Sequence, residues 1–205
     1  MTTVHPASRL DAGTDAAEAI RAKGPRPAVF LDRDGTLIEE VGHLGDPDGV
    51  VLIPGVPEAL GRLSAAGFAL VVASNQGGVA RGLFTEDDIR AVNARTAALL
   101  SAAGAPAIDG WYWCPHHPEF SGPCDCRKPA PGMLKRAAEE LDLDLGASWM
   151  VGDHPVDAGA ARAAGARAIV VRTGHGLLPG AGHDPGPGVI RADDLAAAAD
   201  VILAS

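Results

Sequence analysis

Residues 29–36 read Val-Phe-Leu-Asp-Arg-Asp-Gly-Thr, an apolar run that ends in two carboxylates with a Gly-Thr turn behind them. In a strand, residues i and i+2 point the same way, so Asp32 and Asp34 can face one crevice beyond the strand's carboxyl end. Open α/β sheets bind their ligands there. One carboxylate can attack an electrophile or hold a metal while the other moves a proton, and the amides of residues 34–36 can form an anion nest. The stretch outlines a site that handles phosphate.

From residue 28 onward, short β-rich apolar runs alternate with Ala- and Leu-rich helical stretches. This rhythm is typical of a parallel sheet with crossover helices. We expect strands at residues 28–31, 68–73, 110–114, 149–152 and 168–172, with a weak sixth near 201–203. We expect helices at residues 57–66, after Thr85, at 132–141 and at 156–164, and an irregular flap at 38–53. The predicted fold class is α/β, with a Rossmann-like parallel sheet covered by helices on both faces.

The length of 205 residues suits one well-buried domain, which we place at residues 28–205. Residues 1–27 are polar and rich in Ala and Pro, and we expect them to form an N-terminal extension that is free to move. They lack the basic start and apolar centre of a signal peptide, and no apolar run approaches the roughly 18–20 residues that span a bilayer. These observations predict a cytoplasmic protein without a membrane partner.

The net charge of -9, from 26 acidic and 17 basic residues, argues against a surface built to neutralise nucleic-acid phosphates. A small-molecule substrate fits this balance better. We therefore expect no nucleic-acid partner.

Three further polar groups each follow a predicted strand, in order along the chain. Ser74 and Asn75 can both donate to a phosphoryl oxygen. Lys128 can act as a point charge on the transferring group, and Arg127 as a bidentate clamp on a more distant phosphate or hydroxyl. Asp153 can complete an oxygen-ligand shell for Mg²⁺. Alone, each is more commonly a turn, a surface pair or a helix N-cap, but their conjunction favours phosphoryl transfer.

All three cysteines lie within thirteen residues, in a loop rich in Pro and Gly. Cys114, His116, Cys124 and Cys126 can provide the four thiolate and imidazole ligands of a closed tetrahedral zinc site, which is the structural kind. The alternative is that the cysteines are free, with Cys124 and Cys126 exposed. His117 is the alternative histidine ligand, which spacing alone does not exclude. Zinc would stiffen the loop immediately before the two predicted cations.

These motifs resemble those of the haloacid dehalogenase superfamily of phosphotransferases. The resemblance covers nearly all of residues 28–175, and the matching segments are Phe30 to Thr36, Ser74-Asn75, Lys128 and Gly152-Asp153. It implies that Asp32 attacks phosphorus to form an aspartyl-phosphate and that Asp34 acts as acid and then as base. Mg²⁺ would be held by the side chains of Asp32 and Asp153 and the backbone carbonyl of Asp34. Ser74 and Lys128 would stabilise the charge on the transferring group.

The zinc loop followed by Cys-Arg-Lys-Pro looks like the branch of the superfamily without a cap domain that acts on heptose bisphosphates and histidinol phosphate. The resemblance implies a Mg²⁺-dependent phosphatase that removes the 7-phosphate of D-glycero-D-manno-heptose 1,7-bisphosphate. Because the sequence has no long insertion for a cap domain, we expect a monomer. The residues that it places against the substrate are Glu40, Val41, Gly42, His43, Ser74, Asn75, Gln76, Gly77, Arg81, Arg127 and Lys128.

Some positions depart from the pattern of this branch. His154 follows the metal-binding aspartate where Lys or Arg is common, which would make a substrate contact there depend on pH. The zinc loop is also short, so the preferred anomer of the sugar stays open. Histidinol phosphate and a broader range of sugar phosphates are alternative substrates. A zinc module that binds nucleic acid by stacking bases on Trp111, Tyr112 and Trp113 is a further alternative, against which the net charge argues.

Overall fold

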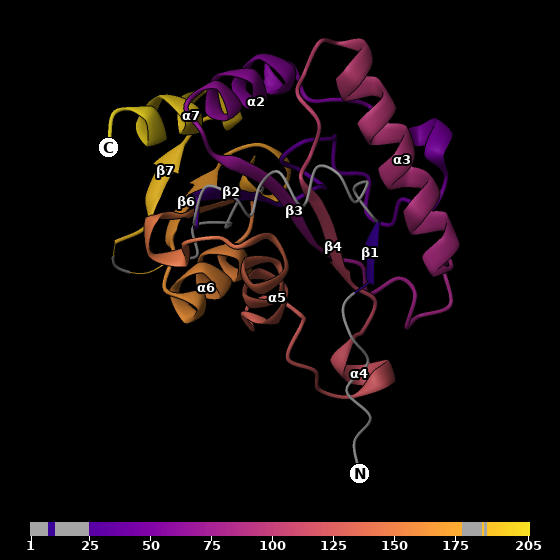
Figure 1. Cartoon of the computed structure of the whole chain (residues 1–205). Helices are drawn as coiled ribbons and strands as arrows, with labels where there is room; N and C mark the ends of the chain where they lie inside the picture. Colours follow the sequence, from indigo (N-terminus) through magenta and orange to yellow (C-terminus); the bar gives the residue numbers. More distant parts are fainter. Residues whose placement is uncertain (1–7, 11–24, 178–185, 187) are drawn as a thin grey trace.

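The computed structural model describes residues 8–10, 25–177, 186 and 188–205 (Figure 1). These residues form a seven-stranded sheet in the order β1-β4-β3-β2-β5-β6-β7. The strands are β1 Ser8–Leu10, β2 Ala28–Leu31, β3 Ala69–Asn75, β4 Gly110–Cys114, β5 Trp149–Gly152, β6 Arg167–Val171 and β7 Ile190–Ala192. The helices are α2 Val56–Ala65, α3 Glu86–Ala102, α4 Pro118–Ser121, α5 Gly132–Leu141, α6 Pro155–Ala164 and α7 Leu195–Leu203, with 3-10 turns η1 Pro47–Gly49, η2 Leu145–Ala147 and η3 Gly174–Leu177.

The strands β2 to β7 are all parallel, which confirms the predicted sheet. At its centre, Phe30 of β2 lies beside Val71 of β3 and Met150 of β5. Among the strands of the described residues, β1, within the expected N-terminal extension, is the one that pairs antiparallel, with β4. The remainder of that extension at residues 1–7 and 11–24 lies outside the described residues.

Helices cover both faces of the sheet because its central strands are apolar on both sides. Alternate residues point to opposite faces of a strand. Val29 and Leu31 belong to the core that α2, α3 and α7 cover, whereas Phe30 belongs to the core under α5 and α6. Figure 1 shows these two helical layers on opposite sides of the strands. The buried central strands give the site a rigid base.

The predicted weak strand near residues 201–203 is wrong, because these residues end helix α7. The side chain of Asp194 accepts a hydrogen bond from the amide of Ala197, which caps the start of this helix. Its apolar stripe, which includes Leu195 and Ile202, is buried against the sheet. The sixth parallel strand is instead β7, directly before the helix.

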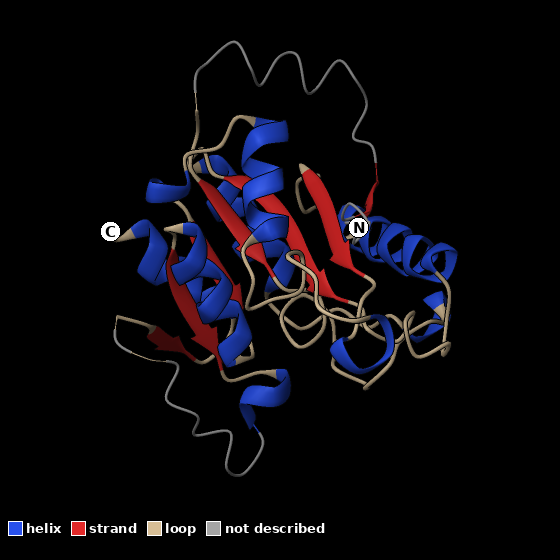
Figure 2. Ribbon diagram, turned by 90° about the horizontal axis from the view of Figure 1, so that it is seen from below, coloured by secondary structure: helices blue, strands red, loops and turns tan. Residues whose placement is uncertain are grey.

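The loops that follow the strands gather at the carboxyl ends of β2, β3, β4 and β5. In Figure 2 the arrowheads of these strands point toward a cluster of loops. Residues 38–53 are irregular, as expected, with η1 as their one helical turn. None of the helices in the described part of the chain is both long and apolar enough to cross a membrane.

Candidate active site

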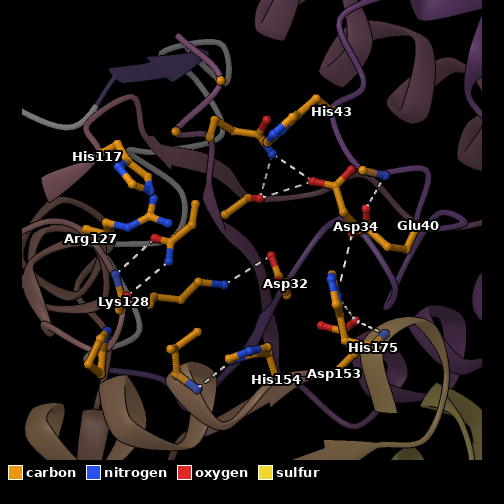
Figure 3. A pocket seen from close by; sticks show the side chains of 18 of the residues that line it. Asp32, Asp34, Glu40, His43, His117, Arg127, Lys128, Asp153, His154 and His175 are labelled. Carbon is orange, nitrogen blue, oxygen red and sulfur yellow. Dashed lines mark hydrogen bonds and ion pairs between the residues drawn. The ribbon is translucent and has the colours of Figure 1, made fainter. Parts of the chain in front are cut away.

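A cavity of about 440 Å³ lies at these strand ends. It gathers the four residues predicted to be catalytic, namely Asp32, Asp34, Ser74 and Lys128, and Asp153 beside them (Figure 3). Its other lining residues are Glu40, Gly42, His43, Asn75, Gln76, Gly77, Gly78, Arg81, His117, Arg127, Pro129, His154, Val156 and His175. Four motifs that are far apart in the sequence therefore meet in one place.

Asp32 lies directly after β2, with 14% of its side chain exposed. Its Oδ1 atom accepts a hydrogen bond from the backbone amide of Arg33 at 2.7 Å and lies 3.0 Å from Nζ of Lys128. Burial raises the pKa of Asp32 to about 6, although the positive charge of Lys128 opposes this shift. The carboxylate is thus desolvated but already beside a cation.

Asp34 is held by donors on both of its carboxylate oxygens. The guanidinium of Arg33 contacts Oδ1 and Oδ2 at 3.0–3.2 Å. Gln76 donates to Oδ2 from Nε2 at 2.7 Å, and the hydroxyl of Ser74 lies 3.5 Å from the same oxygen. Gln76 also donates to the Ser74 hydroxyl at 2.9 Å. The polar residues at the ends of β2 and β3 therefore form one network.

Lys128 is fully buried and lies between two carboxylates. Its Nζ atom is 2.6 Å from Oδ1 of Asp157 and 3.0 Å from Oδ1 of Asp32. Burial acts to lower the pKa of Lys128, but the charges of Asp157 and Asp32 outweigh it and raise the pKa above its ordinary value. Lys128 is therefore a fixed positive charge. The sequence places Asp157 in the same motif as Asp153, four residues later, but its pairing with Lys128 was not predicted.

The side chain of Asn75 makes two hydrogen bonds with the backbone of Lys128. Its Nδ2 donates to the carbonyl of Lys128 at 3.0 Å, and its Oδ1 accepts from the amide of Lys128 at 2.9 Å. Asn75 was expected to contact substrate, and it does line the cavity. Because both of its polar side-chain atoms are engaged, its contacts favour a role in placing Lys128.

Three carboxylates form a compact acidic group beside the cavity. One oxygen from each of Asp32, Asp153 and Asp157 lies within 4.8 Å of the others. Burial raises the pKa of Asp153, and the charge of Asp32 adds to the shift. A divalent cation would relieve this repulsion, and carboxylate oxygens are the ligands that Mg²⁺ prefers. Asp157 is fully buried behind Lys128, whereas Asp32 and Asp153 line the cavity, so the oxygens of Asp32 and Asp153 are the ones that fit such an ion.

His175 lines the cavity and was missed by the sequence interpretation. Its backbone amide donates to Oδ2 of Asp153 at 2.7 Å, and its ring Nδ1 lies 3.1 Å from the same oxygen. Two glycines enclose this carboxylate, since a Cβ at Gly35 or Gly174 would lie 2.2 Å from Oδ2. Both glycines also have positive φ angles, which other residues rarely adopt.

The rim of the cavity is basic on the side of the cysteine loop. Arg81 lies 2.9 Å from Nε2 of His117, measured from Nη2, and its guanidinium is 5.4 Å from the centre of the Phe120 ring. Arg127 donates from Nη1 to the carbonyl of His116 at 3.1 Å. Partial burial and the charges of Arg81 and Arg127 lower the pKa of His117. These contacts hold the positive charges of Arg81 and Arg127 in place at the rim.

Three of the four predicted flap residues line the cavity. Glu40, Gly42 and His43 line it, whereas Val41 does not and is 57% exposed. Glu40 accepts a hydrogen bond from the amide of Gly42, and burial raises its pKa. His154, flagged as a departure from the family pattern, lines the cavity and accepts from the amide of Val156 through Nδ1.

The cysteine loop brings four potential metal ligands together. The Sγ atoms of Cys114, Cys124 and Cys126 lie 3.0–3.6 Å apart, as free thiols. His116 Nδ1 is 3.3 Å from Cys126 Sγ and 3.7 Å from Cys114 Sγ. Tetrahedral zinc with bonds of about 2.0–2.3 Å spaces its ligand atoms by about 3.5–3.8 Å. The four residues fit such an ion, and His117 turns instead toward Arg81.

The thiols show the electrostatics of a metal-ligand set. The hydrogen bond between Cys126 and Cys114 lowers the pKa of Cys126 to about 6 and raises the pKa of Cys114. Burial opposes the shift of Cys126, and a hydrogen bond with His116 adds to it. Thiolates are the form that binds metal.

Comparison with known proteins agrees with this geometry. Residues 125–198 match the HAD-hydrolase-like family model. The chain is 46% identical over 154 residues to the D-glycero-beta-D-manno-heptose-1,7-bisphosphate 7-phosphatase of Yersinia pestis, covering 72% of this chain and 81% of that protein. It is 44% identical over 189 residues to the D-glycero-D-manno-heptose-1,7-bisphosphate 7-phosphatase of Thermosynechococcus vestitus, covering 87% and 96% of the two chains.

Solved structures give the same result. The D,D-heptose 1,7-bisphosphate phosphatase of B. bronchiseptica, in complex with magnesium and phosphate, aligns with a TM-score of 0.79 and 35% identity. The alignment covers 87% of this chain and 98% of that one. The corresponding phosphatase from Burkholderia thailandensis aligns with a TM-score of 0.67 and 32% identity, covering 88% of this chain and 100% of that one.

Proposed function

The chain belongs to the heptose 1,7-bisphosphate 7-phosphatases of the haloacid dehalogenase superfamily, and we propose that it hydrolyses the 7-phosphate of D-glycero-D-manno-heptose 1,7-bisphosphate through an aspartyl-phosphate on Asp32. One observation of the geometry supports this most strongly. Asp32 and Asp34 line a single cavity, and the fully buried ammonium of Lys128 lies 3.0 Å from Asp32.

In the first half-reaction, Asp32 attacks phosphorus and Asp34 supplies a proton. Oδ1 of Asp32 is engaged by Lys128 and by the amide of Arg33, so Oδ2 is the oxygen left to attack. A bond forms from this oxygen to phosphorus while the bond from phosphorus to the sugar oxygen breaks. Asp34 protonates the departing oxygen.

In the second half-reaction, water attacks the aspartyl-phosphate. Asp34, now ionised, takes a proton from the water, and the bond between phosphorus and Asp32 breaks to release phosphate. Lys128 and the hydroxyl of Ser74 stabilise the charge on the remaining phosphoryl oxygens throughout. Asp157 keeps Lys128 charged and in place.

Mg²⁺ would be held by the side chains of Asp32 and Asp153 and by the backbone carbonyl of Asp34, and when bound it would offset the negative charge of the phosphoryl group. Zinc would be held by Cys114, His116, Cys124 and Cys126 and would have a structural role. The residue types fit each ion, as their geometry indicates.

The basic rim of the cavity fits a substrate that carries a second anionic group. Arg127 and His117, which Arg81 contacts, lie on the side of the cavity away from Asp34 (Figure 3). The anomeric phosphate of a bisphosphate would be recognised there. The flap residues Glu40, Gly42 and His43, with Gln76 and Gly77, would contact the sugar. We also propose a monomeric, cytoplasmic protein whose catalytic domain spans residues 28–205 and whose partner is the small-molecule substrate.

The proposal is tested by phosphate release from heptose 1,7-bisphosphate, heptose 7-phosphate and histidinol phosphate in the presence of Mg²⁺. We expect kcat/KM for the bisphosphate to exceed the other values by about tenfold or more. Asp32→Asn should lower kcat/KM for the bisphosphate by roughly a thousandfold or more. A higher kcat/KM for histidinol phosphate would overturn the substrate assignment, and full activity of the Asp32 variant would overturn the mechanism.

A further inference from the structure

Arg33, between the two carboxylates of the first motif, is a buried cation that the mechanism above does not use. Its side chain is 1% exposed. Its guanidinium reaches Asp34 three times, from Nε to Oδ1 at 3.2 Å and from Nη2 to Oδ1 and Oδ2 at 3.1 and 3.0 Å. An arginine loses much hydration on burial, so such a position requires bonded partners of its own.

The second partner of Arg33 lies on helix α3. Its Nη1 donates to Oδ1 of Asn93 at 2.9 Å, and Asn93 is 3% exposed. Within the described residues, Asp34 is the carboxylate that pairs with Arg33. The guanidinium thus connects the active-site carboxylate on one side to a rigid helix on the other.

The backbone of this segment does not depend on the Arg33 side chain. The carbonyl of Arg33 accepts hydrogen bonds from the amides of Leu37 at 2.9 Å and Ile38 at 3.1 Å. Asp32 is oriented by the amide of Arg33, at 2.7 Å. A substitution that keeps these main-chain contacts should therefore act on Asp34 and leave Asp32 in place.

We propose that Arg33, anchored by Asn93, is a positioning residue that fixes the carboxylate of Asp34 in the orientation needed to protonate the leaving oxygen. The inference rests on the proposed function, because it takes Asp34 as the acid. Gln76 restrains Oδ2 from the end of the neighbouring strand β3. The guanidinium is the group that contacts both oxygens, so it sets the plane of the carboxylate. Misplacing a reacting group by about 1 Å can cost a hundredfold in rate.

The test compares two leaving groups. The sugar alkoxide needs a proton to depart, whereas p-nitrophenolate leaves without one, so only the first reaction needs a positioned acid. The parameter kcat/KM is used because it reports the steps through departure of the leaving group. The ratio of the two kcat/KM values does not depend on the fraction of enzyme that is folded, which separates positioning from loss of structure.

We expect Arg33→Met to lower kcat/KM for heptose 1,7-bisphosphate by about 30–100-fold and that for p-nitrophenyl phosphate by less than about fivefold. Asn93→Leu should also lower the ratio of kcat/KM for the bisphosphate to kcat/KM for p-nitrophenyl phosphate, by about fivefold. Arg33→Lys should restore part of the loss, because it returns the charge without the planar fork. Arg95→Met, which removes an exposed arginine on the same helix, should leave both values unchanged.

Asp34→Asn is measured alongside as the reference. In one outcome, Asp34→Asn changes the ratio of the two kcat/KM values, but Arg33→Met leaves that ratio unchanged. The positioning role of Arg33 is then overturned, and the assignment of Asp34 as the acid stands. If Asp34→Asn lowers both values equally, the acid assignment in the proposed function fails instead. The two failures are therefore distinguishable in one data set.

Discussion

Folding buries the carboxylate of Asp32, and the loss of its hydration destabilises its ionised form. Burial raises its pKa from 3.8 to about 6, and the neighbouring charges of Asp157 and Asp34 add to the shift against the attraction of Lys128. A carboxyl group whose pKa is raised by folding stabilises the fold while it is protonated. That contribution is lost as pH rises through the folded-state value. The nucleophile should therefore destabilise the metal-free protein above about pH 6.

We predict that Asp32→Asn stabilises the metal-free protein in a pH-dependent way. Near pH 4 the variant and the wild type should unfold at similar denaturant concentrations, and at pH 8 the variant should be more stable by on the order of 2–3 kcal/mol. Lys128 keeps Asp157 as a partner in the variant. Urea unfolding across this pH range in chelator measures the difference, with the exposed Asp193→Asn as control. A variant less stable than wild type at pH 8 would contradict the argument.

At the level of single residues, the sequence predicts best the side chains that directly follow apolar strands. Asp32, Ser74 and Asp153 carry this signal, and all line the cavity. His175 does not, because it lies on a glycine-rich turn whose contact with Asp153 exists only in the folded chain. The buried pair of Arg33 with Asn93 was also beyond sequence reasoning, since 60 positions separate the two residues.

Among the elements, helix α7 shows where local propensity fails. The run Val-Ile-Leu at residues 201–203 has the composition of a strand. The cap at Asp194 and the alanines that follow it favour a helix instead, and packing against the sheet decides the outcome. By contrast, the helix expected after Thr85 forms as predicted, and its first turn is capped because the amide of Asp88 donates to the Thr85 hydroxyl at 3.2 Å.

We expect the cysteine loop to depend on its proposed zinc ligands for its structure. Its helix α4 has four residues and buries none of them, and Phe120 is 57% exposed. The loop nevertheless supports the rim, because Arg127 donates to the carbonyl of His116 and Arg81 contacts His117. Loss of the proposed zinc ion should therefore affect both stability and recognition of the distal anionic group.

We predict that Cys124→Ser lowers the zinc content of the purified protein from about one ion per chain to near zero and destabilises it by several kcal/mol. KM for heptose 1,7-bisphosphate should rise more than KM for p-nitrophenyl phosphate, which lacks a second anionic group. Metal analysis by mass spectrometry, thermal unfolding and steady-state kinetics provide the readouts. Glu119→Gln, an exposed change in the same loop, should match the wild type. Retention of zinc by the Cys124 variant would exclude the proposed ligand set.

In the whole molecule, the sheet order assembles the site. Strands β3, β2 and β5 are neighbours, so the residues that follow them meet although they span about 120 positions. The alternating pattern predicted parallel strands, because crossover helices require them. It did not predict the order of the strands or the antiparallel strand β1, since strand pairing depends on contacts between distant segments. The shared carboxyl edge was enough to place the motifs together.

The acidic group at this edge leads to a prediction about the whole fold. Because Mg²⁺ would bind only the assembled carboxylates, it should stabilise the native state by RT ln(1 + [Mg²⁺]/Kd), about 2.7 kcal/mol at a hundredfold excess over Kd. For a chain of this size, that corresponds to a rise in Tm of about 5–10 °C. Thermal unfolding during a Mg²⁺ titration of chelator-treated protein measures the shift. Asp153→Asn should remove most of it, whereas Asp193→Asn, at an 81% exposed carboxylate, should retain it. An equal shift in the Asp153 variant would place the ion elsewhere, because a site that lacks one of its two carboxylate side chains cannot keep the same affinity.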